Sequence, residues 1–161
     1  MANKSFSILV PYHGTMVIAT ATEIENPVQM YYQVNFPDGT NSLFHIYEGD
    51  RGWAEAELDV TESAKDIGPI IDMYRHEKYF EPLMIAINET TYAIQPFTED
   101  EGKTIQYEVY KMSGEHLINI FTEKGDEWNY EEISADNDLD YKSLAKQIGA
   151  VIIDRQQNKF S

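Results

Sequence analysis

The sequence repeats itself, and this repeat restricts the possible folds more than any other feature. Tyr32 and Tyr107 lie 75 positions apart, and residues on both sides of them match at the same spacing. A repeat at a fixed spacing indicates that each copy folds as the same supersecondary unit. The matched pairs keep the type of side chain: Met30 with Ile105, Tyr32 with Tyr107, Val34 with Val109, Gly39 with Gly114, Trp53 with Trp128, Glu57 with Glu132 and Leu58 with Ile133.

After Leu58 the spacing increases to 81, so the second copy carries six additional residues. The matches beyond this point are Ala64 with Ala145, Ile67 with Ile148, Gly68 with Gly149 and Ile71 with Ile152. The additional residues fall around Ala135 to Tyr141, a polar stretch rich in aspartate. A loop lengthens there at little entropic cost.

Each copy has the pattern of several strands followed by one helix. Apolar residues alternate in four segments, as one face of a strand requires, and turn signals separate these segments. The predicted hairpin turns include His13-Gly14, Asn88-Glu89 and the glycines Gly39 and Gly114. A short fifth strand surrounds each tryptophan. Helical spacing of three to four follows in both copies: Ala64, Ile67, Ile71 and Tyr74, then Leu144, Ile148, Val151 and Ile152.

The sequence leaves two details of the helices open. Thr61 or Ser63 is a suitable N-cap for the first helix, and Asp138 or Asp140 for the second. Pro69 removes one helical hydrogen bond, so the first helix either kinks there or begins late, with Pro69 in its first turn.

The expected fold class is α+β: a tandem duplication of a unit of four to five antiparallel strands followed by one helix. A helix covers the apolar face of each sheet in two-layer packing, and the copies relate by pseudo-twofold symmetry. We expect residues 1–161 to form a single compact domain made of two repeats, 6–79 and 80–157. The sequence does not decide between one continuous sheet and two packed sheets.

The net charge is strongly negative, with 12 Lys and Arg against 28 Asp and Glu, or −16. Such a surface repels nucleic acids and anionic lipids, whose binding depends on phosphate contacts. We therefore expect no nucleic-acid or membrane partner, and a basic protein is the partner that this charge favours. The apolar run Ile8 to Val10 is too short for a signal peptide or membrane span, which predicts a cytoplasmic protein. We expect a monomer or homodimer.

No metal or cofactor site is predicted. The chain has no cysteine, which excludes disulfides and thiolate chemistry. The four histidines, His13, His45, His76 and His116, have no spacing that brings two ligands together. Asp136, Asp138 and Asp140 resemble the start of a calcium loop, but Tyr141 and Gln147 stand where Gly and Glu are required.

The candidate partner or ligand surface consists of aromatic and acidic residues that lie at matched positions or beside them. The tryptophans favour core packing, and the alternative is an aromatic platform that contacts a partner. The candidates are Trp53, Trp128, Tyr31, Tyr47, Glu48 and Glu123.

Three functional hypotheses follow. The first is a non-catalytic binding or protein-interaction module. The alternative is an acidic inhibitor of a basic partner, either immunity-like or nucleic-acid-mimicking. An enzyme of unknown class comes third, since no catalytic residues converge and no nucleophile elbow or phosphate-binding loop is present.

Overall fold

A computed structural model of the chain describes residues 4–25, 27, 29–47, 52–58, 60–99, 104–122, 127–136 and 138–158. The chain divides into two compact units, Met1–Pro82 and Leu83–Ser161, called unit 1 and unit 2 below. The predicted boundary between the repeats 6–79 and 80–157 lies three residues before the boundary between these units. That the units form one compact domain with pseudo-twofold symmetry stays a prediction.

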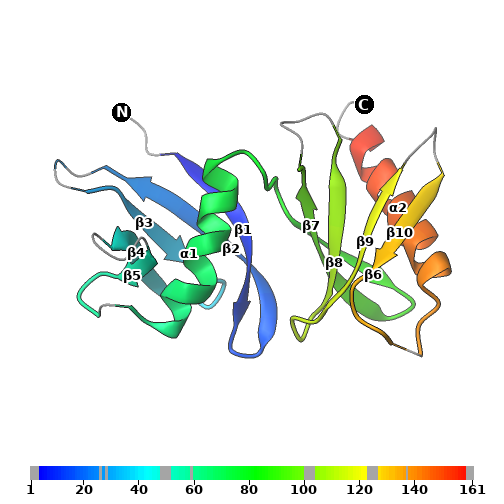
Figure 1. The fold of residues 1–161 in the computed structure, drawn as a ribbon, viewed down its shortest axis with the longest axis horizontal. Coiled ribbons are helices and arrows are strands. Elements are labelled where there is room, and N and C mark those ends of the chain that lie inside the picture. Colours follow the sequence, from blue (N-terminus) through cyan, green and yellow to red (C-terminus); the bar gives the residue numbers. More distant parts are fainter. Residues whose placement is uncertain are drawn as a thin grey trace. The chain divides into compact units, whose positions relative to one another are not determined.

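Both units have the same order of elements (Figure 1). Unit 1 contains β1 (Ser5–Tyr12), β2 (Thr15–Ile24), β3 (Tyr31–Asn35), β4 (Asn41–Tyr47), β5 (Gly52–Glu55) and α1 (Glu62–Arg75). Unit 2 contains β6 (Leu83–Ile87), β7 (Thr90–Phe97), β8 (Gln106–Lys111), β9 (His116–Thr122), β10 (Trp128–Glu132) and α2 (Tyr141–Asn158).

Each unit is an antiparallel meander, with strand orders β1-β2-β3-β4-β5 and β6-β7-β8-β9-β10. Each sheet is followed by its own helix, so the predicted α+β fold with a duplicated strand-helix unit is confirmed. The predicted turns lie where expected. His13, Gly14, Asn88 and Glu89 all have positive φ, as the two-residue hairpin turn with the favoured twist requires.

Matched residues supply part of each core: Val34 with Val109, Ile67 with Ile148 and Ile71 with Ile152 are buried in both units. Tyr32 and Tyr107 are buried against the tryptophans. The ring centroids of Tyr32 and Trp53 are 5.7 Å apart, and those of Tyr107 and Trp128 are 5.8 Å apart. Burial raises the pKa of both tyrosines. Around them pack apolar residues of the sheet and the helix: Ile8, Val34, Phe44, Ile67 and Ile71 in unit 1, and Ile85, Val109, Ile118, Ile148 and Ile152 in unit 2.

The repeated tryptophan and the repeated glycine explain each other. A Cβ atom at Gly68 would lie 2.0 Å from Trp53 Cγ, and one at Gly149 would lie 2.4 Å from the ring of Trp128. Any larger residue would overlap the indole, because real Cβ atoms do not approach other heavy atoms so closely. Each helix therefore crosses its sheet on a glycine that lies against a tryptophan.

One part of this contact differs between the units. Trp53 donates a hydrogen bond from Nε1 to Asp72 Oδ2 at 2.9 Å. The residue of unit 2 that matches Asp72 is Ile153, and the buried Nε1 of Trp128 has no acceptor among the described residues.

The structure decides between the alternatives for the helix ends. Helix α1 begins at Glu62, with the Ala64 amide donating to Thr61 Oγ1 at 3.1 Å, so Thr61 is the N-cap. Pro69 lies inside the helix, and the alternative of a late start is wrong because this cap fixes the first turn ahead of it. For α2 the N-cap is Asp140, whose Oδ1 accepts from the Ser143 amide at 3.2 Å. Within the described residues, neither helix is long and apolar enough to cross a membrane.

Candidate functional site

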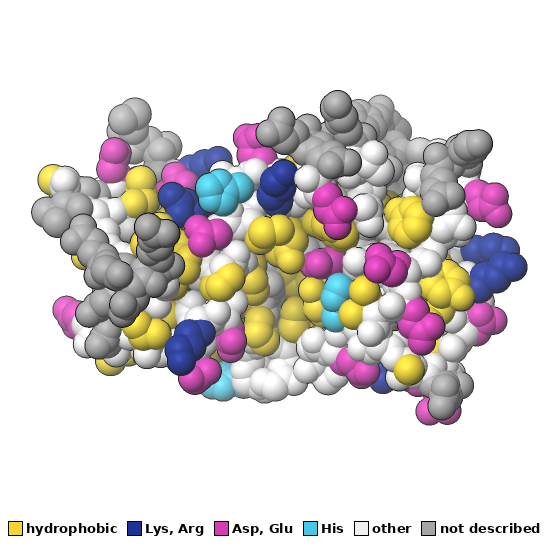
Figure 2. Space-filling view, in the orientation of Figure 1, with side chains coloured by type: hydrophobic (Ala, Val, Ile, Leu, Met, Phe, Trp, Pro, Cys, Tyr) yellow, Lys and Arg dark blue, Asp and Glu magenta, His cyan; other side chains and the backbone are white. Residues whose placement is uncertain are grey.

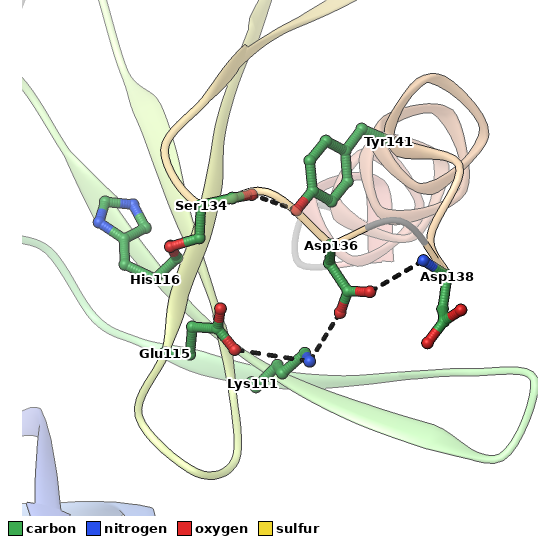
Figure 3. A network of polar contacts seen from close by, with 7 residues as sticks. All are labelled: Lys111, Glu115, His116, Ser134, Asp136, Asp138 and Tyr141. Atoms are coloured by element: carbon green, nitrogen blue, oxygen red, sulfur yellow. Dashed lines mark hydrogen bonds and ion pairs between the residues drawn. The ribbon is translucent and has the colours of Figure 1, made fainter.

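The residues added in the second copy fold back onto the end of strand β8 and form a polar network there (Figure 3). Lys111 is the last residue of β8, and its Nζ lies 2.7 Å from Asp136 Oδ2 and 3.5 Å from Glu115 Oε2. The Asp136 side chain is 14% exposed, compared with 37% for Lys111. The ion pair is thus half-buried and is shared with a second carboxylate.

The same aspartate organises its own loop. The Asp138 amide donates to Asp136 Oδ1 at 3.0 Å, and the Leu139 amide donates to the Asp136 carbonyl at 3.2 Å. The first of these bonds is the local side-chain bonding that makes aspartate a preferred turn residue, and the second is a backbone bond of the same turn. One carboxylate therefore holds the lysine and shapes the inserted segment.

Contacts on either side of Asp136 fix the segment to unit 2. Ser134 donates from its hydroxyl to the His116 carbonyl at 2.7 Å, and Tyr141 donates from its hydroxyl to the Ser134 carbonyl. Tyr141 is itself buried as the first residue of α2. Because both flanks are bonded to the sheet or the helix, the acidic segment is held in one position relative to Lys111.

The electrostatics keep both partners charged. The hydrogen bond to Asp136 raises the pKa of Lys111, and the same bond, with the Asp138 amide, lowers the pKa of Asp136. In unit 1 the position that matches Lys111 is the buried apolar residue Phe36. The ion pair is therefore a property of unit 2 alone.

Beside this network lies an open cleft of about 570 Å³, called the acidic cleft below. Its lining includes Glu89, Tyr92, Lys111, Asp136, Asp138 and Leu139. The lining thus has three carboxylates and one ammonium group, and that ammonium already bonds to Asp136 and Glu115. Glu89 and Asp138 are exposed and form no ion pair with the described residues. The cleft presents unneutralised negative charge, and a cationic group is the ligand that it suits.

The three aspartates considered for calcium do not converge. Asp136 bonds to Lys111, Asp140 caps α2, and Asp138 is exposed. Over the described ranges of the chain, no group of three His, Asp or Glu side chains is placed to hold a metal ion.

Three of the residues predicted from the sequence, Trp53, Trp128 and Tyr31, do not line the acidic cleft. Trp53 and Trp128 occupy equivalent strands and face their own helices. Tyr31 precedes the inward-facing Tyr32 in β3, so it lies on the opposite face of the sheet from Trp53 and contacts His45, with ring centroids 5.4 Å apart. The structure does not bring Tyr31 and Trp53 onto one surface.

The other three candidates carry less structural information. Tyr47 ends strand β4, and its side chain lies outside the described part of the chain, as do Glu48 and Glu123. The role of the six candidates in binding stays a prediction.

Sequence reasoning missed Lys111 and Glu115 as site residues and weighed Asp136 only as a calcium ligand. The available signal was the insertion itself, since a segment present in one copy alone is where that copy differs in surface. Comparisons with known proteins add no assignment, because no family model, curated protein or solved structure matches the chain.

Proposed function

We propose that the chain is a non-catalytic protein-interaction module that binds a basic segment of a partner protein in the acidic cleft of unit 2. The observation that carries this proposal is the charge of the cleft lining, in which Asp136 neutralises Lys111 while Glu89 and Asp138 form no ion pair with described residues. Exposed carboxylates in the lining of a cleft suit an arginine of the partner, because a guanidinium group binds a carboxylate with two parallel hydrogen bonds.

The charge of the whole chain supports the same partner. The net charge of −16 speeds the encounter with a basic protein by long-range attraction. Figure 2 shows Asp and Glu side chains scattered over the displayed face of both units, with Lys and Arg as isolated residues among them. The attraction is therefore broad, and the acidic cleft supplies the local geometry.

An acidic inhibitor is the second proposal, and the spread of acidic side chains over both units supports it. Under this alternative the bound segment belongs to the functional site of a basic partner. The two functions differ in one measurable property: an inhibitor abolishes the activity of its partner on binding, whereas an interaction module leaves that activity in place.

A charge-matched comparison tests the cleft. The probe is a short fluorescein-labelled Arg-Gly repeat peptide, and its binding is followed by fluorescence anisotropy over a range of salt concentrations. The cleft variant is Glu89→Gln with Asp138→Asn. The control variant is Asp66→Asn with Glu77→Gln, which removes the same charge from exposed residues of unit 1.

We expect the cleft variant to weaken peptide binding by about five- to tenfold, because each lost contact is a charge-assisted hydrogen bond. The control should weaken binding by less than about twofold, since exposed charges away from the contact act only through screened attraction. Equal losses in the two variants would show that the peptide senses net charge alone, and the acidic cleft would then not be the binding site.

A further inference from the structure

Unit 1 has a cleft of its own, and it lies at a different place in the fold. It is a recess of about 420 Å³ at the start of β1, the end of β2, the last turn of α1 and the segment that follows α1. We call it the β1–α1 cleft. The acidic cleft of unit 2 is instead lined by β7, the end of β8 and the inserted segment.

The chain after α1 is held tightly against the helix end. The Lys78 amide donates to the Met73 carbonyl at 2.8 Å and the Glu77 amide donates to the Tyr74 carbonyl at 3.1 Å, while Glu77 has φ of +58°. This is the Schellman arrangement, which normally has glycine at the left-handed position. A further bond from the Tyr79 amide to Met73, at 3.1 Å, keeps the segment turned back along the cleft.

Aromatic rings form one wall of the β1–α1 cleft. Phe6 and Tyr74 stack with centroids 5.4 Å apart, and Tyr74 meets Tyr79 edge to face at 5.6 Å. All three side chains are half-buried and line the cleft, as does Phe80. A flat aromatic group gains both apolar burial and favourable ring geometry against such a wall.

Charges of both signs complete the lining. Arg75 has one guanidinium nitrogen 3.0 Å from Asp72 and lies over the Tyr32 ring, with its side chain 32% exposed. Lys4 also lines the cleft and forms no ion pair with the described residues. Opposite charges come from Glu23 and Glu81. The cleft therefore offers donors for a carboxylate and acceptors for an ammonium group.

Unit 2 lacks these charges at the matched positions. The counterpart of Arg75 is Gln156, which donates to the Tyr107 hydroxyl at 3.1 Å, and the counterpart of Glu23 is Thr98. Arg75 lies over the Tyr32 ring and Gln156 bonds to the matched Tyr107, so both copies have the tyrosine contact but only unit 1 has a charged side chain at this position of the helix. The charges of Arg75 and Glu23 are thus not shared features of the repeated fold.

From this lining we infer that the β1–α1 cleft binds a small aromatic zwitterion, of the class of a free aromatic amino acid. The carboxylate binds Arg75 and Lys4, the ammonium group binds Glu23 and Glu81, and the ring packs against the aromatic wall. This inference is independent of the acidic cleft and of the proposed protein partner.

The test uses L-phenylalanine as the probe, followed by amide chemical shifts of the full chain in ¹H–¹⁵N NMR spectra. We expect saturable shifts at residues of the β1–α1 cleft with a Kd at or below about 1 mM, the range open to a ligand of this size. Two monopolar probes of similar size, 3-phenylpropionate and phenethylamine, should each bind at least about tenfold more weakly, because each lacks one charged contact.

Variants that borrow the residues of unit 2 separate binding from folding. Arg75→Gln and Glu23→Thr each introduce the residue that the other copy carries at the same place in its fold, and unchanged amide shifts away from the cleft check that each variant folds. Each should weaken L-phenylalanine binding by about tenfold, whereas Asp138→Asn in the acidic cleft should leave it unchanged. No shifts in the β1–α1 cleft at about 10 mM probe, or equal binding of 3-phenylpropionate and L-phenylalanine, would overturn the inference.

Discussion

Replacing Gly68 by alanine adds one carbon where α1 crosses Trp53. The new Cβ would lie 2.0 Å from Trp53 Cγ, so the helix and the strand must separate until that distance reaches at least 3.4 Å. Overpacking of this kind costs about 1–3 kcal/mol. The upper end applies here, because the other near atoms are Cβ and Cδ1 of Trp53, and Cβ cannot rotate away from the backbone. Alanine in a helix interior recovers about 1 kcal/mol, which leaves a net loss of about 2 kcal/mol.

The same change at Gly149 should cost less. Its Cβ would meet Cδ2, Cε2 and Nε1 of Trp128, each at 2.4 Å, and these ring atoms can move by a small side-chain rotation. The net loss should be about 0–1 kcal/mol once the gain in helix propensity is included. The repeat thus provides two versions of one contact with different predicted sensitivity.

Native-state amide hydrogen exchange measures this difference, because the slowest amides of α1 and α2 report the stability of their own units. Gly52→Ala is the control, since a Cβ at Gly52 meets no atom within 4 Å. Overlap with Trp53 is refuted as the cause if Gly68→Ala leaves α1 as stable as in the unchanged chain, or if Gly52→Ala costs as much.

Three further predictions follow from other contacts. Trp53→Phe should destabilise its unit by about 1–2 kcal/mol more than Trp128→Phe does, because only Trp53 loses a hydrogen bond to a carboxylate; equal losses in hydrogen exchange would contradict this. Glu77→Gly should raise the Tm, with a gain of about 1 kcal/mol from relief of the left-handed backbone, while Glu77→Ala should give no gain. Hydrogen bonds from the side chain and backbone of Thr40 lower the pKa of Asp38 from 3.8 to about 2. Ionised Asp38 therefore stabilises the folded state, fully at pH values above the pKa of the unfolded chain and less as the pH falls towards the folded pKa. The Tm difference between the unchanged chain and Asp38→Asn should shrink as the pH falls from about 5 to 2, and a constant Tm difference would refute this prediction.

The repeat explains why so much of the fold could be predicted from one sequence. Each strand and each helix is indicated twice, so a weak signal in one copy is supported by the other. The sequence could not decide how α1 passes Pro69. Proline inside a helix loses one local hydrogen bond, whereas the stability gained by packing the helix depends on residues far away in the sequence. Thr61 caps the first turn and Ile67 and Ile71 are buried against the sheet, and these contacts outweigh the missing hydrogen bond. A local propensity was overruled by tertiary packing.

The candidate site could not be predicted in the same way. Lys111 ends a strand and Asp136 lies in the insertion, so the repeat says nothing about their pairing. A Lys–Asp contact across a loop depends on how the loop folds back, which is set by the Asp138 amide and the Ser134 contacts in three dimensions. Charge alone indicated a basic partner without indicating where it binds. The inserted position was visible in the sequence, but its geometry was not.

The two clefts lie where the copies differ, and the shared fold explains why. A duplicated unit must keep its tryptophan, the glycine that lies against it and the tyrosine that packs on it, because these residues set the distance between helix and sheet. Positions outside that contact are free to diverge. In unit 2 the insertion brings Asp136 to Lys111, where unit 1 has a buried phenylalanine. In unit 1 the last turn of α1 carries Arg75, where unit 2 has a glutamine that bonds to the matched tyrosine. If both proposals hold, exchanging the residues at 75 and 156 should transfer charge between the copies without loss of fold. The β1–α1 cleft should then lose its zwitterion, while the acidic cleft keeps its basic peptide.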